Sequence, residues 1–185
     1  MASEEEDEFA VMFNEFYPSL CRFIACLLGG RGASGIAQEI AQESFLQLHR
    51  TGLGSLPEGE ARFWLYRVAR NFALNELNKH NTRHRLFGKV IDVFRAHVPT
   101  PEEEFEMAER KGLVIDMLKT LPEQQRAALL LREQEEMSYR EIASVLGVSE
   151  SKVKVDVFRA RTALRERWSK RQNALAASSS SSQAG

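Results

Sequence analysis

The sequence predicts an all-α protein with two small helical domains joined by a flexible linker. Apolar residues recur with the 3.6-residue period of a helix in several segments, and no segment shows the sustained alternation typical of a strand. The composition fits a folded chain, because 43% of the 185 residues are hydrophobic and only 5 are proline. Between the helical segments, residues 81–100 mix basic side chains with one short apolar run, a pattern that favours a linker.

The first half predicts three amphipathic helices that bury one shared core. They are expected over residues 9–28, 36–48 and about 61–80. The first should end at Gly29 and Gly30, because glycine readily adopts the left-handed conformation that closes a helix. A loop rich in glycine and serine, residues 51–59, precedes the third helix. The first predicted domain is residues 8–81, and the linker is expected over residues 82–107.

The second half predicts a cluster of short helices that begin at capping boxes, in which Ser or Thr is followed by Glu three residues later. The three pairs are Thr100 and Glu103, Thr120 and Glu123, and Ser138 and Glu141. The helices are expected over about residues 101–119, 122–135, 138–146 and 149–171. The second predicted domain is residues 108–171, and the serine-rich tail over residues 172–185 is expected to be disordered.

The last two of these helices have the spacing of a helix-turn-helix motif. Ala143 supplies a small residue where the helices cross, Gly147 permits the positive φ of the turn, and Ser149 caps the second helix. In such a motif the second helix enters the major groove of DNA. Its candidate DNA contacts are Lys152, Lys154, Phe158, Arg159 and Arg161. The alternative is a helical hairpin with a solvated basic face, and Asp156 on that face is expected to repel phosphate.

The third predicted helix carries a second candidate contact with nucleic acid. Its members are three or four residues apart and therefore share one helix face: Trp64, Arg67, Asn71, Asn75 and Asn78. An aromatic ring, a cation and amides in line can stack on bases and hydrogen-bond a single strand. The alternative is a solvated face with Trp64 in the core.

The distribution of charge favours two separate contacts with a polyanion. The net charge is only −1, but basic side chains outnumber acidic ones in residues 51–98 and 148–185. Acidic side chains outnumber basic ones in residues 1–50 and 99–147. Two separated basic zones are typical of a chain that contacts nucleic acid at two places, and the acidic zones suggest a basic partner or self-masking.

Other residue types exclude several classes of protein. The four histidines and two cysteines form no catalytic or metal-ligand set by their spacing, so we expect neither an enzyme nor a bound cofactor. The acidic N-terminus lacks the basic region of a signal peptide, and the unbroken apolar runs are far shorter than the ~20 residues that span a bilayer. We therefore expect a cytoplasmic protein without membrane insertion.

Five motifs, taken in order, resemble the extracytoplasmic-function (ECF) class of bacterial sigma factors. They are Phe-Asn-Glu-Phe-Tyr (13–17), Ala-Gln-Glu-Ser-Phe-Leu (41–46), Phe-Trp-Leu-Tyr-Arg-Val-Ala-Arg-Asn (63–71), Leu-Pro-Glu-Gln-Gln-Arg (121–126) and the helix-turn-helix at 138–161. The resemblance covers about residues 9–80 and 113–168. It implies that the first domain is sigma region 2, which binds the clamp helices of RNA polymerase and captures the melted −10 strand of the promoter. It implies that the second domain is sigma region 4, which binds the polymerase flap and reads the −35 element as duplex.

The resemblance also assigns candidate residues to each contact. For polymerase binding they are Glu39, Ile40, Gln42, Glu43 and Leu46. For the −10 strand they are Trp64, Arg67, Asn71, Asn75 and Lys79. For the −35 element they are Arg140, Ser151, Lys152, Lys154, Phe158, Arg159 and Arg161. The resemblance further implies an anti-sigma factor as a partner.

Two other functions stay open. A stand-alone helix-turn-helix regulator would need a dimer interface, and no heptad pattern predicts one. A sigma-like mimic would only titrate an anti-sigma factor. Val155 and Asp156 keep this second alternative open, because the ECF class usually has a small residue followed by arginine at these positions.

Overall fold

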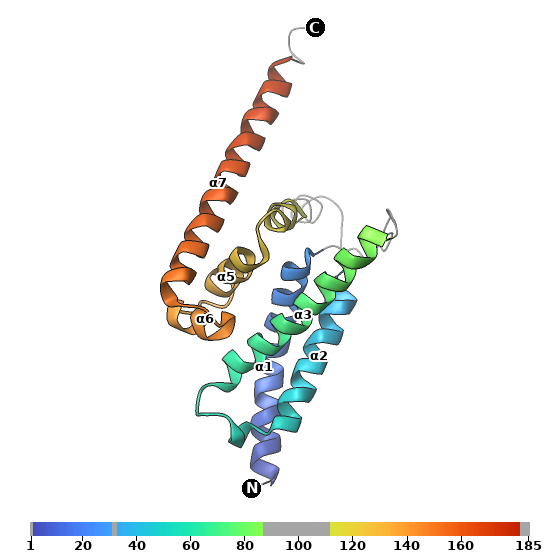
Figure 1. Cartoon of the computed structure of the whole chain (residues 1–185), viewed down its shortest axis with the longest axis vertical. Coiled ribbons are helices and arrows are strands. Elements are labelled where there is room, and N and C mark those ends of the chain that lie inside the picture. Colours follow the sequence, from blue (N-terminus) through green and yellow to red (C-terminus); the bar gives the residue numbers. More distant parts are fainter. Residues whose placement is uncertain (1, 31–32, 87–111, 182–185) are drawn as a thin grey trace.

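The computed structural model describes residues 2–30, 33–86 and 112–181, and the regular structure in these ranges is entirely helical (Figure 1). The helices are α1 (Ala2–Leu28), α2 (Ser34–Thr51), the 3₁₀ helix η1 (Leu53–Ser55), α3 (Ala61–Leu86), α5 (Glu123–Glu133), α6 (Tyr139–Leu146) and α7 (Glu150–Ser181). Residues 112–119 form a further helical stretch before α5. The all-α prediction is therefore confirmed.

The N-terminal half consists of α1, α2, η1 and α3, which pack against one another, and their buried side chains belong to a hydrophobic cluster that continues into the C-terminal half. An aromatic cluster joins α1 to α2, where the Phe13 ring lies 4.9 Å from Phe45 and stacks on Tyr17 at 4.7 Å. Phe23 of α1 meets Tyr66 of α3 edge-on at 5.4 Å. Such aromatic pairs contribute about 0.5–1.5 kcal/mol beyond the burial of their area.

α1 is the central helix of this half. Its segment Asp7–Leu28, 22 residues with a mean hydropathy of 1.2, is long and apolar enough by composition to cross a membrane. Its side chains Leu20, Ile24 and Leu27 are instead fully buried where α1 packs on its neighbours. Burying one such side chain contributes about 1.5–3 kcal/mol to folding. α1 is therefore a core helix of the bundle.

The turn after α1 brings the N-terminal half against the helical stretch 112–119. Gly29 and Gly30 have φ values of 102° and 77°, which confirms that they close the helix. A β-carbon at Gly29 would lie 2.7 Å from Cε of Lys119, and one at Gly30 would overlap the Ile115 side chain. These two glycines therefore permit both the sharp turn and the close approach of the two halves.

The C-terminal half consists of residues 112–119 with α5, α6 and α7, and it contains the predicted helix-turn-helix. The Ser138 hydroxyl accepts a hydrogen bond from the Glu141 backbone N–H, and the Glu141 carboxylate accepts one from the Ser138 N–H, which completes the predicted capping box. Gly147 ends α6 in the left-handed conformation with φ 66° and ψ 36°. Ile142, Val145, Val153 and Val157 fill the space between α6 and α7.

Three predictions about helix ends were wrong. Thr120 and Glu123 form no capping box, because Pro122 is the N-cap residue of α5 and the Thr120 hydroxyl donates to the Met117 carbonyl at 2.6 Å. α3 continues to Leu86, into the predicted linker. α7 continues to Ser181, so residues 172–181, expected to be disordered, are helical. Leucine and alanine in this stretch favour helix, which outweighs the neutral serines. The pair Thr100 and Glu103 and the predicted linker residues 87–107 lie outside the described residues.

Candidate nucleic-acid and protein interfaces

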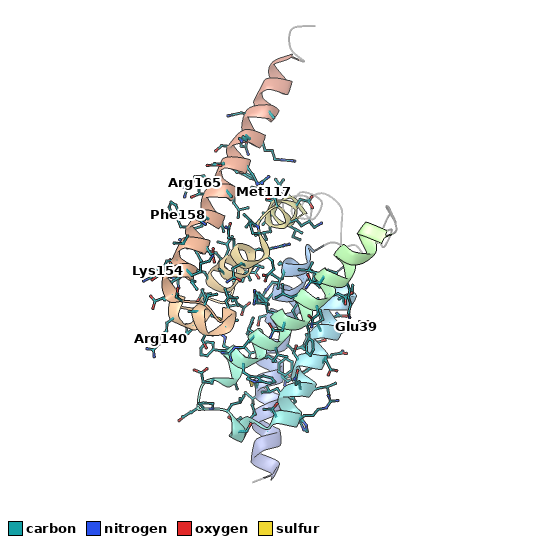
Figure 2. The ribbon with its side chains drawn as sticks, viewed as in Figure 1. Glu39, Met117, Arg140, Lys154, Phe158 and Arg165 are labelled. Carbon is teal, nitrogen blue, oxygen red and sulfur yellow. The ribbon has the colours of Figure 1, made fainter. Side chains whose placement is uncertain are left out.

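The outer side of α7 presents most of the predicted −35 contacts to solvent. Lys154, Phe158 and Arg140 lie on the same outer side of the molecule (Figure 2). The Phe158 side chain is 69% exposed, although it belongs to an otherwise well-packed motif. Val155, three residues earlier on the helix, is exposed as well, and adjacent exposed apolar side chains mark a surface that contacts a partner. Ser151 and Arg159 are exposed as well.

Two cations on this surface are held in place by acidic neighbours. Lys154 Nζ lies 2.8 Å from the Glu150 carboxylate and 5.8 Å from the centroid of the Tyr139 ring. The hydrogen bond with Glu150 raises the pKa of Lys154, which therefore stays charged at neutral pH. Arg161 Nε donates to the Glu133 carboxylate at 3.0 Å, and this hydrogen bond raises the pKa of Arg161. Both cations are thus positioned before any partner binds.

The prediction that Asp156 lies on the recognition face was wrong. Asp156 precedes Phe158 by two residues, which places it about 200° away around the helix. It is only 1% exposed and accepts a hydrogen bond from the Lys152 ammonium. The negative charge therefore faces the protein interior, where Lys152 neutralises it. Val155, in contrast, is 42% exposed and belongs to the outer surface.

The structure divides the predicted −10 stripe of α3 into two parts. Asn71, Asn75 and Lys79 are exposed. Arg67 is directed instead toward α6, where its Nη2 donates to the backbone carbonyl of Ser144 at 2.9 Å and lies 3.0 Å from the hydroxyl. Trp64 is half-buried and packs against the core, so only part of its ring is accessible.

An interface between the two halves centres on Glu135, in the loop between α5 and α6. Glu135 is 6% exposed and accepts a hydrogen bond from the fully buried Tyr66 hydroxyl of α3. Arg62 Nη2 lies 3.7 Å from the same carboxylate and donates to the Glu135 carbonyl at 2.7 Å. The Tyr66 oxygen also lies 2.9 Å from the Ser19 hydroxyl of α1. Burial and then the hydrogen bond to Glu135 raise the pKa of Tyr66, so its hydroxyl remains a donor.

A second contact in this interface joins α3 to the start of α5. Arg70 makes two parallel hydrogen bonds of 2.9 Å to the Glu123 carboxylate and a third of 3.1 Å to the Gln124 side chain. The Arg70 and Glu123 side chains are 11% and 22% exposed. Paired, partly buried contacts of this geometry are stronger than surface ion pairs. Sequence reasoning missed Glu135, Arg70 and Tyr66, because no periodic pattern marks partners that lie more than 50 residues apart.

The predicted polymerase-binding residues all lie on α2, and all of them except Ile40 are exposed. Glu39, Gln42, Glu43 and Leu46 are exposed, and Leu46 keeps half of its surface in solvent. Ile40 is only 9% exposed and packs in the core, and it also lines the groove between α2 and α3, so its role in polymerase binding stays a prediction. Its position on the inner side of an amphipathic helix explains its burial.

Two hollows flank this face of α2. A groove of about 880 Å³ lies between α2 and α3, lined by Glu39, Ile40, Glu43, Phe72, Asn75, Glu76, Asn78 and Lys79. A smaller apolar pocket of about 270 Å³ lies between α1 and α2, lined by Phe9, Phe13, Gln42, Phe45 and Leu46. Glu39 lies on the side of the molecule opposite Phe158 (Figure 2). Among the described residues, no group of His, Cys, Asp and Glu could hold a metal ion.

The chain is similar in sequence to known proteins. Residues 111–164, which contain the helix-turn-helix, match the family model described as Sigma-70, region 4. The chain is 31% identical over 131 residues to the ECF RNA polymerase sigma-E factor of Haemophilus influenzae, covering 66% of this chain and 69% of that protein. It is 34% identical over 138 residues to the RNA polymerase sigma-H factor of Pseudomonas aeruginosa, covering 69% and 70%.

Solved structures share the fold. The sigma factor RpoE of Bartonella quintana, in complex with the anti-sigma factor NepR, superposes with a TM-score of 0.68 at 21% identity, over 86% of this chain and 95% of that chain. CnrH, in complex with the cytosolic domain of CnrY, superposes with a TM-score of 0.66 at 19% identity, over 91% and 92%. The identity and coverage of the curated relatives establish the family: the chain belongs to the ECF sigma factors of bacterial RNA polymerase, which direct promoter-specific initiation of transcription.

Proposed function

We propose that this sigma factor reads the −35 element as duplex with α7 and captures the melted −10 strand with α3, while α2 binds core RNA polymerase. The observation that carries the proposal is the outer side of α7, where Lys154 is held beside an exposed Phe158 on a well-formed helix-turn-helix. A helix with this surface fits the major groove, where cations contact phosphate and an apolar side chain can meet a thymine methyl group.

The −10 strand is proposed to bind the exposed part of the α3 stripe. Asn71 and Asn75 are exposed one turn apart, and Lys79 follows one turn later. Amides can hydrogen-bond base edges, and the lysine can neutralise phosphate. Strand capture also contributes energy for melting, because a base stacked on an aromatic ring, such as the accessible part of Trp64, returns about 1–3 kcal/mol. Asn71→Ala should therefore reduce the formation of open complexes more than the binding of closed promoter DNA.

Core polymerase is proposed to bind the exposed face of α2. Its carboxylates Glu39 and Glu43 can pair with basic side chains, and Leu46 beside the small apolar pocket can bury an apolar side chain of the polymerase clamp. This face is separate from the outer side of α7, so one molecule can hold polymerase and the −35 duplex together (Figure 2).

An anti-sigma factor is the proposed restraint on this activity, in the cytoplasm of the cell. The two structural neighbours are each bound to a protein that their descriptions name, NepR and CnrY, and NepR is described as an anti-sigma factor. The exposed Leu46 and Phe158 surfaces are available for such a partner.

Run-off transcription with core polymerase tests the proposal. A promoter template selected from random DNA should give one discrete start site with the wild-type chain. Leu46→Glu should abolish the transcript without unfolding the protein, because the side chain is already half exposed. A chain that bound an anti-sigma factor but gave no start site on any selected template would be a sigma-like mimic, and the proposal would be refuted.

A further inference from the structure

The helix that carries the −35 face continues well beyond the helix-turn-helix. The match to sigma region 4 ends at residue 164, whereas α7 runs to Ser181. This extension projects beyond the other described helices (Figure 1). Its seventeen residues add about 26 Å at 1.5 Å per residue. The family match therefore leaves this part of the helix without a function.

The extension is basic and exposed. Residues 165–174 hold four cations and one acid, and every one of these ten residues is exposed. The cations are Arg165, Arg167, Lys170 and Arg171. Trp168, between them, is 45% exposed. In a chain whose net charge is −1, this segment is a local concentration of positive charge.

The extension also continues the recognition surface. Arg165 follows Phe158 by seven residues, which is two turns of an α-helix. Figure 2 shows Lys154, Phe158 and Arg165 along the same outer side of α7. The other cations lie around the helix, since Arg167 is about 200° from Arg165.

We propose that residues 165–171 of α7 form a second DNA contact, which binds the phosphate backbone of the duplex next to the −35 element. The inference rests on the proposed −35 reading by Phe158 and Lys154. From Phe158 to Arg171 the helix rises about 20 Å, more than the ~12 Å width of the major groove. The end of the helix must therefore leave the groove, and it passes a sugar–phosphate strand as it does so. Arginines on several sides of the helix can each contact a phosphate where the helix leaves the groove, because phosphates lie along both edges of the groove.

This contact lengthens the bound DNA without reading its sequence. The far end of the contact, Arg171, lies about 20 Å along the helix from Phe158, which spans at most ~6 base pairs at 3.4 Å each. The exposed Trp168 ring can pack against the sugars of the same strand. Affinity, and not promoter choice, should therefore depend on the extension.

The test measures binding of the full-length chain to a duplex that carries a promoter selected from random DNA, over a range of salt concentrations. Arg165→Gln should reduce the slope of log K against log salt by about 0.9, the value for one lost phosphate contact. Glutamine keeps a similar helix propensity, and Arg165→Lys should restore the slope because it keeps the charge. The control Arg22→Gln removes one exposed charge from α1 and should leave the slope unchanged.

A second arm shortens the duplex from each end in turn. The wild-type chain should lose affinity when one flank becomes shorter than about 6 base pairs, and the Arg165→Gln chain should be less sensitive to that change. The inference is overturned if Arg165→Gln changes neither the salt slope nor the dependence on duplex length, because the extension then makes no DNA contact. If Lys154→Gln reduces the salt slope in the same experiment, the proposed −35 reading still stands. Weaker binding of Arg165→Gln to core polymerase alone would overturn it in favour of an acidic protein partner. Failure of the wild-type chain to bind any selected duplex would refute the proposed function itself.

Discussion

Removing one hydroxyl, by Tyr66→Phe, should loosen the interface between the two halves. The ring is fully buried against Phe23, and phenylalanine keeps that packing. The substitution removes the donor to Glu135, which is 6% exposed, together with the hydrogen bond between the Tyr66 and Ser19 hydroxyls within the N-terminal half. Hydrogen bonds to charged groups contribute about 1.5–3 kcal/mol. Arg62 still lies 3.7 Å from the carboxylate and offsets part of the loss. We call chains closed when the two halves are in contact, as in this structure, and open when they are apart. The full loss would raise the ratio of open to closed chains by about 10- to 150-fold, since 1.4 kcal/mol corresponds to tenfold, and with the offset we expect the lower end of this range.

The assay is the distance between two fluorophores, one on each half. Exposed positions Gln47 on α2 and Ser169 on α7 accept cysteine for labelling, after Cys21 and Cys26 are changed to alanine. Tyr66→Phe should shift molecules from a single short distance toward longer ones. Tyr17→Phe is the matched control, because Tyr17 stacks on Phe13 within the N-terminal half. An unchanged distance distribution in a folded Tyr66→Phe chain would refute the role of this hydroxyl.

High pH should weaken the same hydrogen bond between Tyr66 and Glu135. The pKa of Tyr66 is raised in the folded chain above its ordinary value of 10.0, chiefly by burial. The folded state therefore holds this proton more tightly, so its contribution is complete below pH 10 and is lost as pH rises further. The wild-type chain should lose closed molecules above about pH 10 more steeply than Tyr66→Phe does. Parallel pH curves for the two chains would contradict this linkage.

Three further predictions concern the helix-turn-helix. Asp156→Arg should reduce the free energy of unfolding by at least about 3 kcal/mol, because it places a cation beside Lys152 at a buried position. Thermal unfolding measures this loss. A stable Asp156→Arg variant that bound DNA more strongly would contradict the buried placement of residue 156. Gly147→Ala should cost about 1 kcal/mol of stability, because φ is 66° and no atom crowds the site. Gly35→Ala within α2, where space is also open and the backbone is helical, should instead stabilise the protein by about 0.4–1 kcal/mol. Hydrogen bonds from Ser138 lower the pKa of Glu141 below 4.5. The carboxylate of Glu141 therefore stabilises the folded chain above that pH, and this contribution is lost as the pH falls through the pKa of the folded state. Glu141→Gln should make the free energy of unfolding less dependent on pH in this acid range, and an unchanged dependence would contradict the prediction.

The helices could be predicted from the sequence, because each of them is specified locally. The apolar period, the glycines after α1 and the Ser138 capping box each act within a few residues, and the structure confirms all three. The length of α7 was underestimated, because the serine-rich composition suggested disorder although alanine and leucine precede it.

The interface between the halves could not be predicted in the same way. Arg70 and Glu123 are 53 residues apart, and Tyr66 and Glu135 are 69 apart. Nothing in the local sequence distinguishes these side chains from solvated ones on an amphipathic helix. The error over Asp156 is different, because its angular position could have been counted from Phe158. A charge about 200° from the recognition face is on the buried side of the helix.

The position of Arg67 links the closed arrangement to the proposed −10 contact. Its Nη2 atom donates to Ser144 in the closed chain, and the same atom cannot at the same time donate fully to a phosphate or a base. Strand capture by α3 must therefore replace the α3–α6 contact, and it must also separate Arg70 from Glu123 if α6 moves together with α5. The Arg67 guanidinium is charged, and a hydrogen bond that involves a charged group contributes about 1.5–3 kcal/mol, about as much as the 1–3 kcal/mol that a base stacked on an aromatic ring returns. The exchange at Arg67 is therefore close to neutral. The Glu135 and Arg70 contacts, and not Arg67, therefore set the energy that polymerase must supply before the proposed −10 surface of α3 becomes complete.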